Sequence, residues 1–266
     1  PKYLKEVEKA ALADEVPIIR RSMQSLISFL LEMKKPNAVL EIGTAVGFSS
    51  MFMSEYVPED TIIDTIEKVP IRIKCAKENF ERYGKNDRIT LYEGDAVDVL
   101  KKLAAEGRKY DFIFMDAAKG QYLNFLEPVL DMLTDDGLLV TDNVLQDGDI
   151  IQSRYAITKR DRTIHGRMRE YLYFLTHSER FKTVVLPVGD GAALSQVIRA
   201  DRKKEPGRKA FPLRSGISGG APPPPPGGPA SAPQGRGWHS RGRTAPKGRS
   251  WRNWAPRPPV GRPAAR

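Results

Sequence analysis

Five short apolar stretches alternate with helical patterns between residues 38 and 142, and this alternation limits the possible fold more than any other feature. The stretches cover residues 38–42, 61–66, 88–92, 110–115 and 137–141. Between them, apolar residues at helical spacing occupy residues 49–56, 70–83, 97–106 and 122–132. Two further helices are predicted before the first strand, over residues 3–13 and 17–33. Strands that alternate with helices favour a parallel sheet with right-handed crossover connections.

The end of this pattern differs from the rest. After a helix around residues 168–177, strand-like residues 183–186 and 194–198 flank a turn at 189–191 (GDG). A connection this short joins only antiparallel neighbours. We therefore predict an α/β fold, with a Rossmann-like, doubly wound, mostly parallel seven-stranded sheet that ends in an antiparallel hairpin.

A glycine turn follows the first strand. Apolar residues 38–42 lead into Gly43 and Gly47, and an apolar helix begins at about Ser49. A strand, a glycine turn and a helix N-terminus present backbone N–H groups to a nucleotide-like ligand. The glycine spacing departs from G-x-G-x-x-G, so the dinucleotide fingerprint is not met. By itself the turn fits either a nucleotide site or an ordinary strand-to-helix connection.

Acidic or amide residues stand at the carboxyl ends of all five strands. They are Glu41, Glu67, Asp95, Asp116, and the pair Asp142 and Asn143. In an open α/β sheet this edge is where ligands bind. Any one of these side chains could instead cap a helix, but a complete row along one edge favours a ligand site.

Two parts of this row have a distinct chemistry. Glu67 lies 24 positions after Gly43, where a carboxylate reaches a ribose diol through two hydrogen bonds. No basic residue replaces it, so an unphosphorylated ribose is expected. Asp116, Asp142 and Asn143 form an oxygen-only set, which suits Mg²⁺, Mn²⁺ or Ca²⁺ rather than zinc.

Composition divides the chain near residue 200. Residues 201–266 hold 15 Lys and Arg against 2 Asp and Glu, whereas residues 1–200 hold 28 against 31. The formal net charge of +10 therefore belongs to the tail. This Pro/Gly/Arg-rich tail includes five consecutive prolines at 222–226 and few aliphatic residues, so we predict disorder. It could be an RNA-binding arm with three stacking tryptophans, or a non-native extension such as a shifted reading frame would add.

The chain has one cysteine, Cys75, which excludes an intramolecular disulfide and favours a reducing, cytoplasmic location. It contains no export signal and no run of 18 apolar residues, so neither export nor a membrane span is expected. The chain begins at Pro1 rather than at a methionine, so we expect that further residues precede it.

The motifs at the strand ends together resemble a known family. They lie in the expected order at residues 40–47 (LEIGTAVG), 66–67 (IE), 94–96 (GDA), 116–119 (DAAK), 142–144 (DNV) and 188–191 (VGDG). This combination is similar to the metal-dependent class I O-methyltransferases that use S-adenosylmethionine, the group containing catechol and caffeoyl-CoA O-methyltransferases. The resemblance covers residues 14–200. It implies a methyltransferase domain over residues 1–200, followed by the tail at 201–266.

The resemblance also implies a cofactor site. The residues expected to contact S-adenosylmethionine are Glu41, Gly43 and Ser49 at its methionine end, Glu67 at its ribose, Asp95 and Ala96 at its adenine, and Asp116. Glu41 is an unfavourable neighbour for a phosphate, but it suits a ligand with a cationic amino group and a sulfonium. A cofactor without a pyrophosphate would also explain the missing third glycine.

Further roles carried over from the family concern the reaction itself. Asp116, Asp142 and Asn143 match the metal ligands, and Lys119 matches the lysine regarded as the base in catechol-type enzymes. The expected catalytic pair is therefore Lys119 with Asp116, although a plain surface lysine is the alternative. A divalent cation lowers the pKa of a hydroxyl and fixes its position, and methyl transfer needs that oxygen in line with the S–CH₃ bond.

A basic stretch at residues 154–169 indicates the acceptor. It contains Arg154, Lys159, Arg160, Arg162, Arg167 and Arg169, with Asp161 as its only acid. Such clusters contact phosphates. The stretch also resembles the bacterial branch that methylates 5-hydroxyuridine at the tRNA wobble position to 5-methoxyuridine. We therefore expect tRNA to bind over it, with Tyr155 or Tyr122 stacked on a flipped-out base.

Other interpretations of the same residues stay open. The basic stretch also fits an ordinary surface helix, a dimer contact or an acidic small substrate. The alternative enzyme is an O-methyltransferase of a small catechol-like phenol. An alternative of another class is a non-catalytic RNA-binding protein on a methyltransferase scaffold, which the complete set of Asp116, Asp142 and Asn143 argues against. A homodimer is common for such folds, and no residue specifies its interface.

Overall fold

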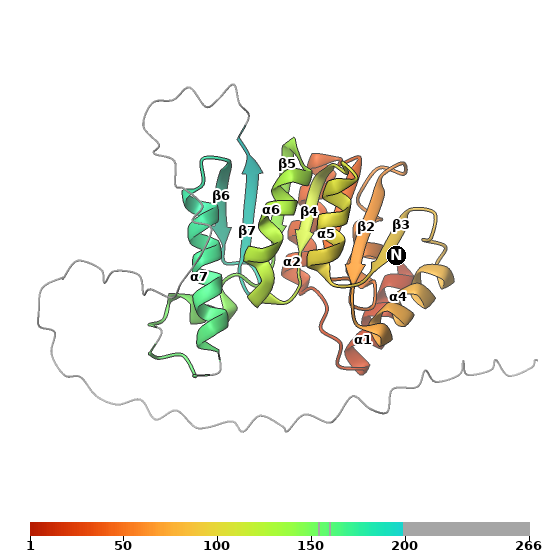
Figure 1. Cartoon of the computed structure of the whole chain (residues 1–266). Coiled ribbons are helices and arrows are strands. Elements are labelled where there is room, and N and C mark those ends of the chain that lie inside the picture. The colour runs from red at the N-terminus through yellow and green to blue at the C-terminus, as the bar shows by residue number, and fades with distance from the viewer. Residues whose placement is uncertain (154, 160, 199–266) are drawn as a thin grey trace, which may run out of the picture. The chain divides into compact units, whose positions relative to one another are not determined.

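A single seven-stranded sheet forms the centre of the computed structural model, which describes residues 1–153, 155–159 and 161–198 (Figure 1). The strands are β1 (Ala38–Ile42), β2 (Ile62–Glu67), β3 (Ile89–Glu93), β4 (Tyr110–Met115), β5 (Leu133–Thr141), β6 (Phe181–Leu186) and β7 (Ala192–Val197). Their order across the sheet is β3-β2-β1-β4-β5-β7-β6. Strands β1 to β5 are parallel, and β7 is antiparallel to both β5 and β6. The predicted fold class is confirmed.

Helices connect the strands and cover both faces of the sheet (Figure 1). In the described part of the chain they are α1 (Lys2–Ala13), α2 (Arg21–Lys34), α3 (Phe48–Met53), α4 (Pro70–Arg82), α5 (Ala96–Ala105), α6 (Tyr122–Met132) and α7 (Arg162–His177), with short 3₁₀ helices η1 (Lys119–Gln121) and η2 (Gln146–Ile151). The start of α4 is favoured by Pro70 in its first turn, where no backbone N–H is needed. Among these helices, none is long and apolar enough to cross a membrane.

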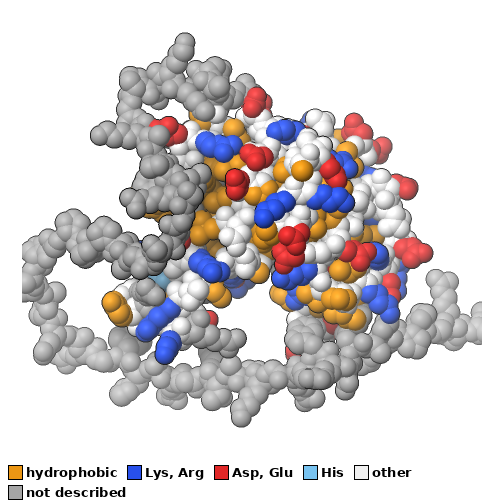
Figure 2. All heavy atoms as spheres, in the orientation of Figure 1, with side chains coloured by type: hydrophobic (Ala, Val, Ile, Leu, Met, Phe, Trp, Pro, Cys, Tyr) orange, Lys and Arg blue, Asp and Glu red, His pale blue; other side chains and the backbone are white. Residues whose placement is uncertain are grey.

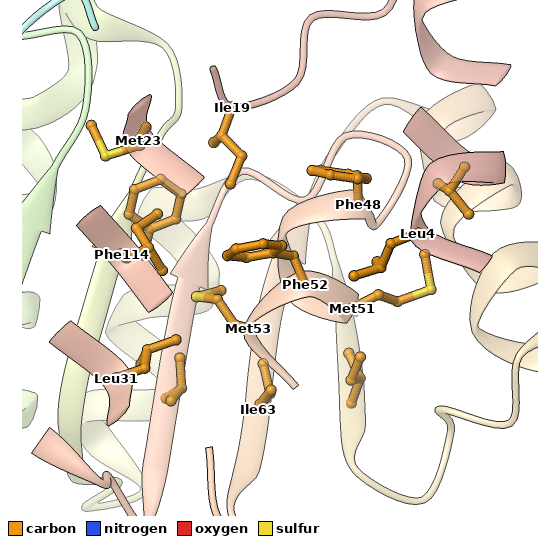
Figure 3. Close-up of a cluster of buried hydrophobic side chains, with 14 of the residues drawn as sticks. Leu4, Ile19, Met23, Leu31, Phe48, Met51, Phe52, Met53, Ile63 and Phe114 are labelled. Carbon is orange, nitrogen blue, oxygen red and sulfur yellow. The ribbon is translucent and has the colours of Figure 1, made fainter. Parts of the chain in front are cut away.

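Alternation along the strands builds a core on each face of the sheet. On β4, Phe112 and Phe114 point to the face covered by α1 to α4, whereas Ile113 and Met115 point to the face covered by α5 to α7. All four side chains are fully buried. Figure 3 shows Phe114 among the apolar side chains of α2 and α3. Because both faces are covered, the carboxyl edge of the sheet remains as the place for a ligand.

The segment before α2 corrects one prediction. The helix predicted from Pro17 begins only at Arg21, and residues 16–20 are not helical. Val16 and Ile19 are buried in the core of the α1–α4 face, so the segment is fixed by packing rather than by helical hydrogen bonds. As a result, the non-helical segment can line the edge of the sheet.

Two other boundaries shift by four residues or more. Strand β5 begins at Leu133 rather than at residue 137. The prediction missed its first residues because the polar residues before Gly137 interrupt the apolar pattern. Helix α7 begins at Arg162 rather than near residue 168, and its basic first turns carry the buried His165. The predicted tail at 201–266 lies outside the described residues.

Candidate active site

A pocket of about 600 Å³ opens along the carboxyl edge of the sheet. Its walls come from residues 17–20, from the loops that follow β1 to β5, and from Asp190 between β6 and β7. Nine of the ten predicted site residues line it: Gly43, Ser49, Glu67, Asp95, Ala96, Asp116, Lys119, Asp142 and Asn143. The polar row at the strand ends therefore forms one continuous site.

The glycine turn after β1 is shaped by close backbone contacts. Gly43 has a φ of +110°, and a Cβ atom there would overlap the carbonyl oxygen of Asp116 and lie 2.9 Å from its carbonyl carbon. The N–H groups of Gly43 and Thr44 both donate to the carbonyl oxygen of Ile66, at 3.1 Å. Gly43 is thus required where the end of β1 passes the end of β4, and only glycine adopts this conformation without strain.

Glu41 lies inside the fold, near the carboxyl end of β1. Its side chain is fully buried and is not part of the pocket wall. Its Oε2 accepts hydrogen bonds from the hydroxyls of Ser50 and of Thr65, the latter at 2.6 Å. Burial raises the pKa of this carboxyl, while hydroxyl hydrogen bonds from Ser49, Ser50 and Thr65 oppose the rise. Glu41 therefore supports the turn from beneath, and its contact to the methionine end of the cofactor stays a prediction.

Glu67 and Asp95 line the pocket and also hold its walls. Glu67 Oε2 accepts a hydrogen bond from the N–H of Ala45 at 2.9 Å, and its Oε1 accepts one from the N–H of Lys68 at 2.9 Å. Asp95 caps α5 by accepting from the N–H of Val97 at 3.0 Å, and it forms an ion pair with Lys68 at 3.2 Å. Glu67 therefore ties the glycine turn to β2, a structural role that the sequence did not reveal. Their contacts to ribose and adenine stay predictions.

The oxygen set at the other end of the pocket fits a divalent cation. Burial and the neighbouring carboxyl of Glu41 raise the pKa of Asp116 to about 6. Burial and the nearby Asp116 raise the pKa of Asp142 to about 7. Asp142 is buried and Asp116 is half-buried, and a cation held by both would stabilise these two mutually repelling carboxylates. No group of three His, Cys, Asp or Glu in the described residues could hold a metal, so the third oxygen would come from the amide of Asn143.

These raised pKa values predict how pH affects the protein without metal. The usual pKa of Asp is 3.8, so between pH 4 and 7 the folded state binds more protons at Asp116 and Asp142 than the unfolded state does. Stability is therefore lost as pH rises through this window. In EDTA, the melting temperature should fall by roughly 5 °C between pH 5 and pH 8 because of this pair. Thermal denaturation measures the change.

The Asp142→Asn variant is the control, because other groups also titrate in this range. It should lose most of the pH dependence that the pair causes, and added Mn²⁺ should stabilise the wild type more at pH 8 than at pH 5. If the melting temperature of the wild type falls with pH no more than that of Asp142→Asn, the raised pKa values of Asp116 and Asp142 are not the cause of the pH dependence.

The basic residues of α7 lie near the pocket but are partly used within the fold. Arg167 donates a hydrogen bond to the carbonyl oxygen of Gly120, at 2.9 Å, and Gly120 lies in η1 between two residues of the pocket wall. Arg162 and Arg169 also donate to backbone carbonyl oxygens. The other two arginines of the predicted stretch lie outside the described residues: Arg154 and Arg160.

The two tyrosines proposed to stack on a base differ in position. Tyr122 is 1% exposed, its hydroxyl donates to the carbonyl oxygen of Asp142 at 3.3 Å, and its ring packs against that of Tyr171. Tyr122 therefore cannot stack on a ligand, and that prediction is wrong. Tyr155 is 87% exposed, so its role stays a prediction. The pocket wall also includes Asp190, a residue of the GDG turn to which the sequence gave no role.

The comparison with known families agrees with the fold and with this site. A family model described as O-methyltransferase matches residues 1–198. The chain therefore belongs to the O-methyltransferase family, and the family predicted from its motifs is confirmed at this level.

Three similar proteins illustrate the relationship. A catechol O-methyltransferase of Niastella koreensis is 30% identical over 126 residues, which are 47% of this chain and 57% of that protein. A candidate caffeoyl-CoA O-methyltransferase of Staphylococcus aureus is 31% identical, with a TM-score of 0.68 over 73% of this chain and 91% of that chain. A methyltransferase of Podospora anserina bound to S-adenosylhomocysteine (SAH) is 28% identical, with a TM-score of 0.67 over 74% and 88%.

Proposed function

We propose that this protein transfers a methyl group from S-adenosylmethionine to a hydroxyl group, with a divalent cation held by Asp116, Asp142 and Asn143. One observation carries the proposal: a single pocket is lined by the glycine turn, by Glu67 and Asp95 at the ends of two other strands, and by these three residues. The SAH-bound relative supports the identity of the donor, since SAH is the donor without its methyl group. The catechol O-methyltransferase relative supports a hydroxyl acceptor.

The pocket residues divide the work of such a transfer. When bound, S-adenosylmethionine would supply an electrophilic methyl group, and the cation would lower the pKa of the acceptor hydroxyl. Glu67 has lone pairs that can accept hydrogen bonds from a ribose diol. Lys119 would receive the hydroxyl proton on its Nζ while the oxygen–carbon bond forms and the sulfur–carbon bond breaks. Both Lys119 and Asp116 line the pocket, and they are close enough for the charge of Lys119 to lower the pKa of Asp116.

Replacing Lys119 with methionine should lower kcat by about 100-fold or more, the usual contribution of a positioned proton acceptor. SAH affinity, measured by calorimetry, should change little, because the resemblance assigns the donor to other residues. Lys101→Met is the matched control, since Lys101 is exposed on α5 and away from the pocket wall. Equal kcat values for Lys119→Met and Lys101→Met would refute the role of Lys119.

For the acceptor, we propose 5-hydroxyuridine at the wobble position of tRNA, which would give 5-methoxyuridine. The described part of the basic stretch supports this choice with Lys159, Arg162, Arg167 and Arg169 against Asp161. In Figure 2, Lys and Arg side chains gather at the end of the molecule where α7 begins, whereas both signs of charge alternate elsewhere on this face. A local positive cluster at a pocket is what binding of a phosphate backbone requires.

A competition between two acceptors tests the proposal. The full chain is incubated with labelled S-adenosylmethionine, Mg²⁺, and either catechol or tRNA that carries 5-hydroxyuridine at the wobble position. We expect label in 5-methoxyuridine. Lys159→Gln should lower kcat/KM for tRNA a few-fold. It should also reduce the salt dependence of kcat/KM for tRNA by the amount expected for about one lost phosphate contact, and kcat/KM for catechol should not change. Lys101→Gln is the charge-matched control.

The opposite results identify the alternatives. Label in catechol alone would favour a small phenolic acceptor, which the catechol O-methyltransferase relative keeps as the second candidate. Binding of tRNA with label in neither acceptor would favour a non-catalytic RNA-binding protein. Either result would reject methylation of 5-hydroxyuridine.

A further inference from the structure

The turn between β6 and β7 is locked against the loop that follows β5. The N–H of Val144 donates to the carbonyl oxygen of Gly191 at 3.0 Å, and the N–H of Leu145 donates to the carbonyl oxygen of Asp190 at 2.9 Å. Gly191 has a φ of +91°, and a Cβ atom there would lie 2.8 Å from the backbone nitrogen of Leu145. These contacts fix the backbone of Asp190 relative to its neighbour Asn143.

The side chain of Asp190 lies between two charged or polar partners. Its Oδ2 accepts a hydrogen bond from Asn143 Nδ2 at 3.1 Å, and its Oδ1 forms an ion pair with Arg20 at 2.6 Å. The side chain of Asp190 is only 10% exposed. Each carboxylate oxygen therefore has its own partner, one from the loop after β5 and one from the non-helical segment before α2.

The orientation of the Asn143 amide follows from this arrangement. An amide has donor hydrogens on Nδ2 and an acceptor on Oδ1. Rotation of the amide by 180° would bring Oδ1 against the carboxylate of Asp190, where two acceptors repel each other. The carboxylate therefore keeps Nδ2 on its own side and leaves Oδ1 for another ligand. Asn143 itself has a φ of +58°, so the loop already holds this residue in an uncommon conformation.

We propose that Asp190 is a positioning residue for the cation site, which acts by holding Asn143 Oδ1 toward the cation. This inference rests on the proposed cation site of Asp116, Asp142 and Asn143. Asp190 acts through Asn143, because both of its own oxygens already have partners. The positive charge of Arg20 offsets the third carboxylate that this arrangement brings close to Asp142. Residues that orient a metal ligand in this way typically change metal affinity by 10- to 100-fold.

Binding of Mn²⁺ to the full chain, measured by electron paramagnetic resonance, tests the inference. Asp190→Ala should weaken Mn²⁺ binding by about 10- to 100-fold. Asp190→Asn should restore most of the affinity, because an amide oxygen can accept the same hydrogen bond. Asp87→Ala removes the same charge at an exposed site away from the pocket and should leave the affinity nearly unchanged.

A second background separates orientation from general stability. In Asn143→Asp, both terminal atoms of the side chain are oxygens. Either orientation of the carboxylate therefore presents an oxygen to the cation. Adding Asp190→Ala to Asn143→Asp should therefore not weaken Mn²⁺ binding. An Asp190→Ala change that merely loosens the fold would weaken binding in both backgrounds and would overturn the inference.

Asn143→Ala distinguishes this inference from the proposed function. If Asn143→Ala binds Mn²⁺ weakly but Asp190→Ala binds it like the wild type, the positioning role is wrong and the cation site stands. If Asn143→Ala and the wild type bind Mn²⁺ equally, the cation site itself is wrong, and the inference fails with it.

Discussion

Replacing Asp142 with asparagine is expected to abolish measurable methyl transfer. It should also weaken Mn²⁺ binding by at least about 100-fold, which is the largest change in metal affinity that loss of a residue that only orients a metal ligand typically causes. The substitution keeps the shape of the side chain. It also keeps an oxygen that can accept the hydrogen bond from the N–H of Asn143, now at 2.6 Å to Asp142 Oδ1. The loop should therefore stay folded while one negative charge of the cation site is lost.

The same variant should be more stable than the wild type in EDTA at pH 8. The buried carboxyl of Asp142 has a pKa of about 7, so at pH 8 it is ionised at a cost that the neutral amide avoids. Low activity combined with a higher melting temperature identifies a residue kept for the cation rather than for the fold. Calorimetry with Mn²⁺, a methyl-transfer assay and thermal melts measure the three quantities.

Asp87→Asn is the control for this prediction, because it makes the same change at an exposed site that does not line the pocket. Its activity, Mn²⁺ affinity and melting temperature should match those of the wild type. If Asp142→Asn kept its methyl transfer in the presence of EDTA, both the cation site and the mechanism would be wrong.

The sheet and its ligand edge could be predicted because both depend on local patterns. Residues 38–42 and 110–115 are apolar runs bounded by polar residues, which is typical of strands buried on both faces. Parallel strands then bring their carboxyl ends to one edge whatever their order. The polar residues that follow them, such as Asp116 and Asp142, are thereby placed together without any knowledge of side-chain contacts.

The exact role of each polar residue could not be predicted, since it depends on partners that are distant in the sequence. Glu41 and Glu67 are the same residue type near the carboxyl ends of neighbouring strands, but the register pairs Glu41 with Thr65, two residues before Glu67. The hydroxyl of Thr65 on the neighbouring strand accommodates Glu41 within the fold, whereas Glu67 reaches the pocket. The position of Tyr122 at the start of a helix likewise favours contact with a ligand, but its ring packs against that of Tyr171 in α7. Propensity and spacing contain no information on such packing.

Replacing Gly43 with alanine is expected to cost about 3 kcal/mol or more of stability, from the strained backbone and the steric overlap together. The φ of Gly43 is +110°, and the added Cβ would collide with the backbone of Asp116 at its carbonyl oxygen and carbon. A backbone atom cannot move aside as a flexible side chain can. The end of β4 would have to shift, and Asp116 would move with it. Thermal or urea denaturation measures the loss of stability.

Gly84→Ala separates strain from collision. Gly84 also has a positive φ, +60°, but a Cβ atom there would meet nothing within 4 Å, so its replacement should cost only about 1 kcal/mol. Because Gly43 abuts Asp116, Gly43→Ala should also weaken both SAH and Mn²⁺ binding, while Gly84→Ala should leave both unchanged. Equal losses of stability in the two variants, with unchanged Mn²⁺ affinity, would contradict the close approach of β1 and β4. The glycine turn would then serve the donor alone and would have no part in holding the cation site.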